Sequence, residues 1–175
     1  MELRPETPAD HAAIDEIHHA AFAGDRRIVP LLHALRDAPA NLPPRGFVAD
    51  DTVGHVLLSA SRLDAPARLV DVYVLSPIGV LPAHQGHGIG TALVAHAVAE
   101  ADRAGVPLLF LEGDPGYYGP RGFAAAGPLG FRSPSLRIPE PAFQVVRLSA
   151  YEPWMTGTLV YSEPFWAHDC VGLRG

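Results

Sequence analysis

The feature that most restricts the fold is a change of hydrophobic period on the two sides of a glycine-rich turn. The run from Arg68 to Val80 is rich in valine and leucine, which is typical of a buried strand. After it comes the segment Gln85-Gly86-His87-Gly88-Ile89-Gly90, and from Gly88 to Ala104 the apolar residues recur at helical spacing. Glycines let backbone N–H groups turn inward, and a helix start carries partial positive charge. The pattern therefore predicts an anion site, most naturally for phosphates, between a strand and a helix.

Two common phosphate-binding motifs do not fit this turn. The P-loop requires G-x-x-x-x-G-K-[ST], but all thirteen basic residues of this chain are arginine. The dinucleotide fingerprint G-x-G-x-x-G has a different spacing, because the glycines here are spaced two and two. Either the turn serves another phosphate ligand, or it is a glycine-rich turn that binds nothing.

The remaining pattern predicts a mixed α/β three-layer domain, with helices, then antiparallel strands, then a strand–helix–strand crossover. Thr7 is placed as an N-cap, with Pro8 at the first helical position and Asp10 at the third. Acidic residues at positions 50 and 51 separate two strands of a hairpin. The other predicted elements are a second helix over Arg26–Arg36 and strands over residues 2–4, Gly46–Asp50, Val53–Leu63, Val106–Leu111 and Phe143–Leu148.

Length and composition narrow the class of protein. A chain of 175 residues favours one domain, residues 1–175. The apolar runs are far shorter than the ~20 residues that cross a bilayer, and the start shows no secretory pattern, so we expect a cytoplasmic protein without membrane contact. Nineteen acidic against thirteen basic residues, with no basic run, argue against a nucleic-acid partner. A single cysteine, Cys170, excludes a cysteine cluster, and we expect no metal site.

Two motifs in order resemble a known family. Residues 80–93 read V-x-P-x-x-Q-G-x-G-I-G-x-x-L, which resembles the acetyl-CoA signature of the GNAT superfamily of N-acetyltransferases. The family core [R/Q]-x-x-G-x-[G/A] is matched by Gln85, Gly88 and Gly90. The segment LEGDPGYYGPRGF, residues 111–123, resembles the second signature of the bacterial YhbS-like branch, and TGTLVYSEPF, residues 156–165, also fits that branch. The resemblance covers about residues 45–165.

The resemblance implies a mostly antiparallel mixed sheet with a central V-shaped splay, flanked by helices. It also implies acetyl-CoA as co-substrate, bound by a core over about residues 45–150, with residues 151–175 as a C-terminal extension. Backbone amides of the turn would hold the coenzyme pyrophosphate, and the end of the preceding strand would bulge at Gly79 and pair with the pantetheine arm. The residues so implied are Ile78, Gly79, Val80, Gln85, Gly86, His87, Gly88, Ile89, Gly90 and Thr91. We interpret His84 and His87 as flanking phosphates rather than as metal ligands.

Acetyl transfer to an amine also requires two proton movements. The resemblance implies Tyr118, four residues before Gly122, as the general acid that protonates the leaving thiolate. Tyr117 is the competitor, because adjacent residues on a helix point about 100° apart. Both rings packing on the end of the sheet is the structural alternative.

The general base is less clearly indicated. Asp71 is the carboxylate nearest to the middle of the strand that precedes the glycine turn, and a side chain that faces solvent at the strand start is the alternative. Glu112 and Asp114 end the next strand, although Asp114 before Pro115 also fits a helix N-cap. A chain of water molecules would serve equally well.

Three functions remain open from the sequence. The first is an N-acetyltransferase that transfers acetyl from acetyl-CoA to an amine of a small molecule or protein. The second is a non-catalytic acyl-CoA sensor, and the third is a structural unit that uses its splayed strands for assembly; a homodimer is compatible with each. The residues considered for an acceptor pocket are Arg26, Arg27, Tyr73, Trp154 and Trp166.

Overall fold

The structure is a computed structural model that describes all 175 residues. Its centre is a nine-stranded sheet in the order β1-β2-β3-β4-β5-β8-β6, with β9 beside β3 and β7 beside β9. The strands are β1 (Leu3–Pro5), β2 (Arg45–Ala49), β3 (Gly54–Asp64), β4 (Leu69–Val80), β5 (Leu108–Glu112), β6 (Ala124–Ala125), β7 (Phe131–Arg132), β8 (Phe143–Arg147) and β9 (Gly157–Val160). The helices are α1 (His11–Ala21), α2 (Ile28–Asp37), α3 (Ile89–Arg103), α4 (Pro115–Tyr118) and α5 (Glu163–Ala167). Only β4–β5 and β7–β9 are parallel pairs, so the predicted mostly antiparallel α/β sheet is confirmed.

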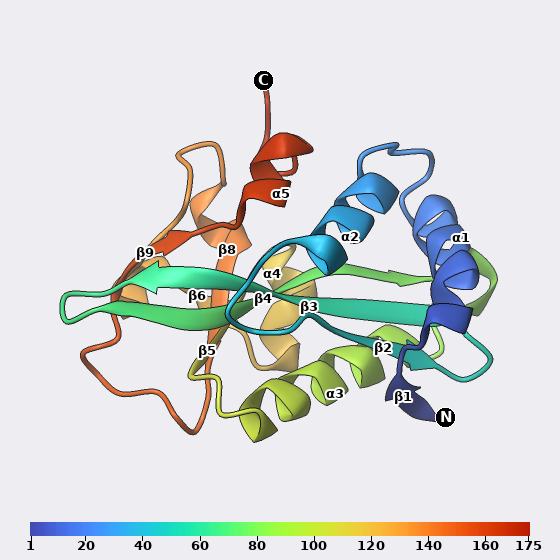
Figure 1. The fold of residues 1–175 in the computed structure, drawn as a ribbon, viewed down its shortest axis with the longest axis horizontal. Helices are drawn as coiled ribbons and strands as arrows, with labels where there is room; N and C mark the ends of the chain where they lie inside the picture. The colour runs from blue at the N-terminus through green and yellow to red at the C-terminus, as the bar shows by residue number, and fades with distance from the viewer.

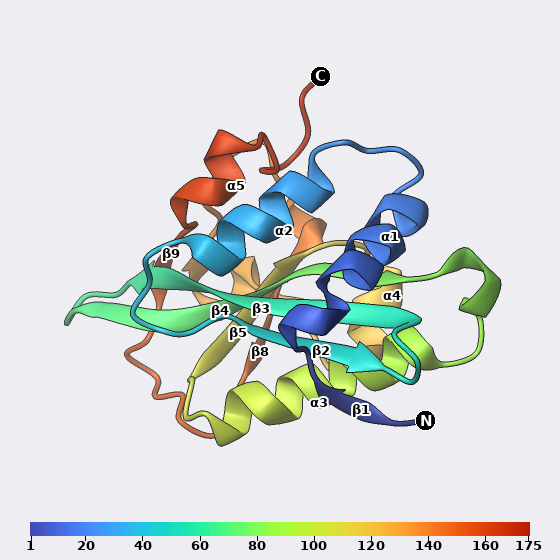
Figure 2. The same ribbon diagram turned by 45° about the vertical axis from the view of Figure 1, so that its right-hand side comes forward.

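Helices cover both faces of the sheet, as Figures 1 and 2 show from two directions. α1, α2 and α5 lie on one face and α3 lies on the other. The alternation along β4 explains this arrangement, because successive side chains of a strand point to opposite faces. Val72 and Val74 join the core under α1 and α2, whereas Tyr73 and Leu75 join the core over α3.

Capping residues begin the first helical segment where the sequence predicts. Thr7 precedes a short 3-10 turn over Pro8–Asp10, and its backbone N–H donates to Asp10 Oδ2 at 2.8 Å. Arg4 also donates to both oxygens of Asp10 at 2.8 Å. This contact fixes β1 to the start of α1.

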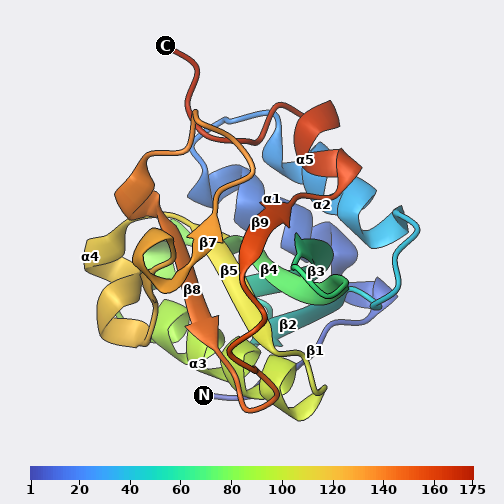
Figure 3. The same ribbon diagram turned by 90° about the vertical axis from the view of Figure 1, so that its left-hand side faces the viewer.

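The two central strands separate part-way along their length. β4 pairs with β5 only at Tyr73 with Leu109 and at Val74 with Phe110. Beyond that point β4 remains paired with β3 as far as Val80, whereas β5 continues beside β8. Figure 3 shows β5 beside β8 and β9 beside β3. One edge of β4 therefore lacks a strand partner over its last residues.

The family resemblance implied a bulge in β4 at Gly79, but the bulge lies elsewhere in this strand. Ser76 and Pro77 lie opposite the single residue Leu57, and Gly79 is paired regularly with His55. Gly79 instead allows close packing with α1, because a Cβ atom there would lie 3.0 Å from His18 Nδ1.

Several element boundaries also differ from the prediction. The second helix begins at Ile28 rather than at Arg26, and the strand expected from Val106 begins at Leu108, after a proline. Proline cannot donate to a sheet ladder, which favours the later start. Residues 151–175 contribute β9 and α5, and Phe165 of α5 is buried in the core under α2. No helix is long and apolar enough to span a lipid bilayer.

Candidate active site

The turn before α3 has the backbone geometry that its glycines suggest. Gly86 and Gly88 have φ angles of +78° and +83°, in the left-handed region that favours glycine. Gly88 is the N-cap of α3, so the first backbone N–H groups of the helix lie next to the turn. An added Cβ at either glycine would meet no atom within 4 Å. These glycines are therefore required by backbone conformation, not by crowding.

Gln85 fixes this turn to the end of β4. Its side-chain Nε2 donates to the backbone oxygen of Val80 at 3.0 Å. The backbone N–H of Leu81 donates to the oxygen of Val53 at 2.9 Å, which ties the same segment to the start of β3. The Gln85 side chain thus stabilises the turn. Ligand contacts at the turn are left to its backbone groups.

A cavity of about 550 Å³ extends from this turn to the separated end of β4. It brings together the end of α1, the end of β4, the turn and α4. Its lining residues are Ala21, Phe22, Ile78, Gly79, Val80, His84, Gln85, Gly86, Gly88, Ile89, Gly90, Thr91, Asp114, Tyr117, Tyr118 and Arg121. His87 is absent from this lining, because its ring turns back and its Nδ1 lies 3.2 Å from the oxygen of His84.

Arg121 is a lining residue that the sequence reasoning missed. Its guanidinium donates to Thr91 Oγ1 from Nε at 3.1 Å and from Nη2 at 2.7 Å, which places a positive charge beside the first turn of α3. It also lies over the ring of Tyr117, 3.6 Å from the ring centroid. A cation beside a helix start, where the first backbone N–H groups have no partner within the helix, favours a phosphate ligand. The only sequence signal was its position in the segment GPRGF.

The two adjacent tyrosines point to different ends of the cavity. Their ring centroids are 4.8 Å apart and their planes meet at 80°. The hydroxyl of Tyr117 lies over Gly90, so close that a Cβ atom there would overlap it. The ring of Tyr118 packs against Gly113 at the end of β5 and against Phe123, with centroids 5.9 Å apart. Burial, and secondarily Tyr117, raises the pKa of Tyr118 to about 12, so its hydroxyl is protonated at neutral pH.

Comparison with known proteins identifies the family of this site. The model of the acetyltransferase (GNAT) family matches residues 12–126. The chain belongs to the GNAT family. YjhQ of Escherichia coli (strain K12), named an uncharacterized N-acetyltransferase, is 26% identical over 163 residues, which cover 89% of each protein.

Solved structures agree with this assignment. The GNAT family N-acetyltransferase YhbS from Escherichia coli, in complex with CoA, is 28% identical with a TM-score of 0.81, over 94% of this chain and 91% of YhbS. A GNAT family acetyltransferase from Brucella melitensis, in complex with acetyl-CoA, is 30% identical with a TM-score of 0.73, over 94% of this chain and 97% of that one. The YhbS-like resemblance of the sequence is confirmed.

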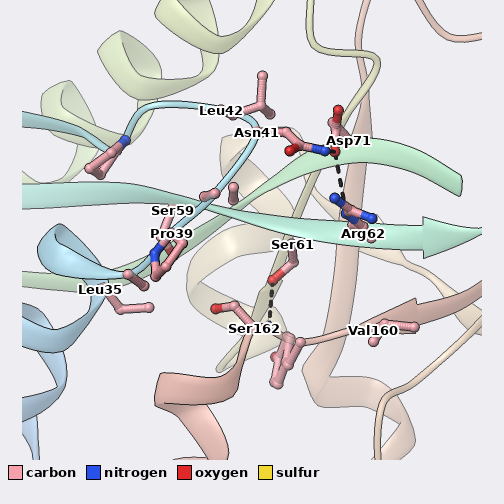
Figure 4. A pocket seen from close by; sticks show the side chains of 15 residues that line it. Leu35, Pro39, Asn41, Leu42, Ser59, Ser61, Arg62, Asp71, Val160 and Ser162 are labelled. Carbon is pink, nitrogen blue, oxygen red and sulfur yellow. Dashed lines mark hydrogen bonds and ion pairs between the residues drawn. The ribbon is translucent and has the colours of Figure 1, made fainter.

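The structure does not bring Asp71 into the cavity of this GNAT domain. Position 71 is nine residues before position 80 on β4, which at ~3.3 Å per residue is about 30 Å. Asp71 instead lines a separate cavity of about 200 Å³, where its Oδ1 lies 3.6 Å from Arg62 Nε and accepts a bond from Asn41 Nδ2 at 3.4 Å (Figure 4). We therefore assign Asp71 no part in proton transfer.

The two alternative carboxylates have partners of their own. Asp114 accepts from the backbone N–H of Gly116 at 2.8 Å, which confirms the N-cap interpretation. Glu112 accepts from the hydroxyl of Tyr161 and from the backbone N–H of Gly172, both at 3.1 Å. Burial raises the pKa of Glu112, although these two hydrogen bonds lower it in part. It is not among the residues that line the cavity.

The residues considered for an acceptor pocket also lie outside this cavity. Tyr73 is buried over α3 and donates to the oxygen of Pro43 at 2.6 Å. Arg27 donates to Asp25 at 2.7 Å, and Trp166 Nε1 donates to the oxygen of Tyr161 at 3.3 Å. Near the end of α1 the cavity is instead lined by Phe22, which the sequence reasoning did not consider for an acceptor pocket. No group of three or more His, Cys, Asp or Glu residues is placed to hold a metal ion.

Proposed function

We propose that this GNAT domain binds acetyl-CoA in the cavity of about 550 Å³ and transfers the acetyl group to an amine. The similarity to YhbS in complex with CoA and to the Brucella enzyme in complex with acetyl-CoA supports this ligand. The backbone N–H groups at Gly86–Gly90 and the guanidinium of Arg121 would hold the pyrophosphate.

The unpaired edge of β4 would hold the pantetheine arm as an additional strand would. β5 has left β4 after Val74, so the backbone groups between Ser76 and Val80 are free to pair on that side. A backbone N–H among Ile78–Val80 would then face the thioester carbonyl and stabilise the negative charge that develops on its oxygen. This arrangement needs no polar side chain on β4, consistent with the apolar sequence there.

The chemical step is direct attack by the acceptor nitrogen on the thioester carbon. The C–N bond forms, the carbonyl oxygen carries the charge of the tetrahedral adduct, and the C–S bond then breaks. The Tyr118 hydroxyl would donate its proton to the leaving sulfur. Its pKa near 12 keeps the proton in place until charge develops on sulfur, and the buried surroundings that raise the tyrosine pKa also raise that of a thiolate.

The observation that carries the proposal is the position of Tyr118. It lies against Gly113, at the end of β5, in the same cavity as the glycine turn and on the side where β5 has separated from β4. Tyr117, by contrast, lies over Gly90 at the phosphate end.

The test is a thermal-shift titration with acetyl-CoA and free CoA, followed by a screen of amines that detects released thiol. We expect both acetyl-CoA and CoA to raise the melting temperature. At a concentration of 100 times Kd, a ligand that binds only the folded protein adds about 2.7 kcal/mol to the free energy of unfolding. Release of thiol that depends on an amine identifies the enzyme. Binding without release supports a sensor instead, and no shift at millimolar acetyl-CoA contradicts both.

A further inference from the structure

A chain of buried polar side chains ends beside the cavity, and the transfer described above does not use it. His18 on α1 and His55 on β3 are both fully buried. His18 Nε2 lies 2.7 Å from His55 Nδ1, and His55 Nε2 lies 2.6 Å from Glu6 Oε2. Glu6 also accepts from Arg36 Nε at 2.9 Å.

Hydrogen-bond accounting fixes the proton positions along this chain. Burial alone would raise the pKa of Glu6, but hydrogen bonds from His55 and Arg36 lower it to about 2, so Glu6 is a carboxylate and only accepts. His55 Nε2 must then carry a proton. Burial lowers the pKa of His55, so its ring is neutral and its Nδ1 accepts the proton of His18 Nε2.

The last nitrogen of the chain is left with a free lone pair. Burial, with His55 and Arg36, lowers the pKa of His18 to about 3, so this ring is also neutral and its Nδ1 is unprotonated. Nδ1 is buried and has no hydrogen-bond partner. A buried acceptor without a donor costs free energy and requires an explanation.

The position of this lone pair suggests the explanation. His18 Nδ1 faces Gly79 of β4, 3.0 Å from where a Cβ atom would be, so any larger residue there would crowd it. Gly79 lines the cavity, and so does Phe22, whose ring stacks on His18 with centroids 5.9 Å apart. One residue on each side of the imidazole therefore forms part of the cavity wall.

We propose that Nδ1 of His18 accepts the N–H of the acceptor amine and takes its proton during acetyl transfer. The proposal rests on the proposed function and assigns its acceptor as an amine that enters between Phe22 and Gly79. His18 is fully buried and does not itself line the cavity, so the ring of Phe22 must turn aside to admit the amine. The amine enters as the free base, after its ammonium form has lost a proton to water.

After the C–N bond has formed, the N–H bond of the adduct breaks and leaves its electron pair on that nitrogen. The new N–H bond forms at His18 Nδ1, and the positive charge passes to the imidazole. His18 Nε2–H stays bonded to His55, and His55 Nε2–H stays bonded to Glu6, whose negative charge stabilises the imidazolium. After the products leave, His18 releases this proton to water and the Tyr118 phenolate takes one proton back from water.

The charged groups around His18 come from several elements. Glu6 precedes α1, Arg36 is on α2, and His11 at the start of α1 lies 3.6 Å from Glu6 Oε1. His55 is on β3, and β4 contributes only Gly79 at this point. Glu6 favours a positive charge on His18, whereas Arg36 and His55 oppose it. His18 is therefore a transient proton acceptor that functions when the attacking nitrogen has become strongly acidic.

The test compares His18→Gln with the parent enzyme on two amines, 2-phenylethylamine and hydroxylamine. The Gln amide nitrogen can still donate to His55, but the variant lacks Nδ1. Because hydroxylamine nitrogen holds its proton much less tightly, water can remove that proton. We expect kcat to fall at least about 100-fold with 2-phenylethylamine and less than about tenfold with hydroxylamine. The matched control is His33→Gln, which breaks an exposed contact to Asp15 of 2.9 Å and should change neither rate.

The outcomes are distinguishable. An equal loss with both amines, or no loss, would overturn the role of His18 and leave the transferase function intact. If the parent enzyme acetylates neither amine and the amine screen finds no other acceptor, it is the proposed function that fails.

A second measurement does not depend on folding of the variant. Nitrogen-15 NMR of the parent protein should show the proton of His18 and of His55 on Nε2 at pH 7, with both Nδ1 atoms unprotonated. A proton on His18 Nδ1 would show that it cannot accept another, and would overturn the proposal.

Discussion

Mild acid should destabilise this protein through His18, by an amount that follows from its burial. Its pKa falls from the usual 6.5 to about 3 in the folded protein, chiefly because burial disfavours the charged ring. The contribution of neutral His18 to the free energy of unfolding is complete above pH 6.5 and is lost as the pH falls toward 3, because only the unfolded chain binds the proton in that range. At pH 5 the loss from this one residue is about 2 kcal/mol. That is a large fraction of the 5–15 kcal/mol that is typical of folded domains.

The assay is urea unfolding of the parent and of His18→Gln at pH 7.5, 6.5, 5.5 and 5. Glu6 does not titrate in this window. Burial alone would raise its pKa, but hydrogen bonds lower it to about 2. Its contribution to the free energy of unfolding is therefore lost only below about pH 4.5. His55 titrates in the same direction in both proteins, because burial and its contacts with Glu6 and Arg36 remain. The parent should therefore lose about 2 kcal/mol more than the variant between pH 7.5 and pH 5. Equal losses in the two proteins would refute the account of His18 as a neutral buried ring.

Three further predictions concern the cavity. Tyr118→Phe should lower kcat and kcat/KM together by about 10²–10⁴-fold and leave the acetyl-CoA affinity nearly unchanged, whereas Tyr117→Phe should lower kcat much less. Steady-state kinetics and calorimetry of both variants check this, and equal activities would contradict the assignment of the acid. Gly88→Val forces a β-branched residue to a φ of +83°, which should turn the backbone N–H groups away and abolish the thermal shift with acetyl-CoA; a preserved shift would mean that the turn does not hold the phosphates. Arg121→Ala removes the guanidinium at Thr91 and should weaken acetyl-CoA binding about tenfold or more, with a smaller dependence of Kd on salt; unchanged calorimetric affinity would remove Arg121 from the phosphate site.

Local signals in the sequence predicted the longer helices and strands but not β6, β7, β9 or α5. The capping pattern at Thr7, Pro8 and Asp10 and the change of period at the glycine turn depend on residues within a few positions of one another. The valine and leucine run of β4 was recognised as a strand for the same reason.

Features that depend on distant partners could not be predicted in this way. The bulge at Ser76 and Pro77 exists only relative to Leu57 on β3, and the place of β9 depends on pairing with residues near Arg62. A strand register is a property of two segments, and the pattern of either one alone leaves it open.

The same limit applies to the candidate site. The turn and Tyr118 were found because each lies in a contiguous motif, but Phe22 and Arg121 reach the cavity from segments about 100 residues apart in the chain. Asp71 was chosen as the carboxylate nearest to the middle of the strand before the turn, and the extended geometry of β4 places it far from the cavity. His18 and His55 are 37 residues apart in the chain, and only their 2.7 Å contact in the structure makes them a pair.

The most direct test of the account is a crystal structure of the protein with acetyl-CoA. We expect the pyrophosphate against the backbone N–H groups of Gly86–Gly90 and beside Arg121, the pantetheine arm along the free edge of β4, and the thioester sulfur within hydrogen-bonding distance of the Tyr118 hydroxyl. Coenzyme in the cavity that Asp71 lines, or a thioester sulfur that contacts Tyr117 instead of Tyr118, would contradict the account.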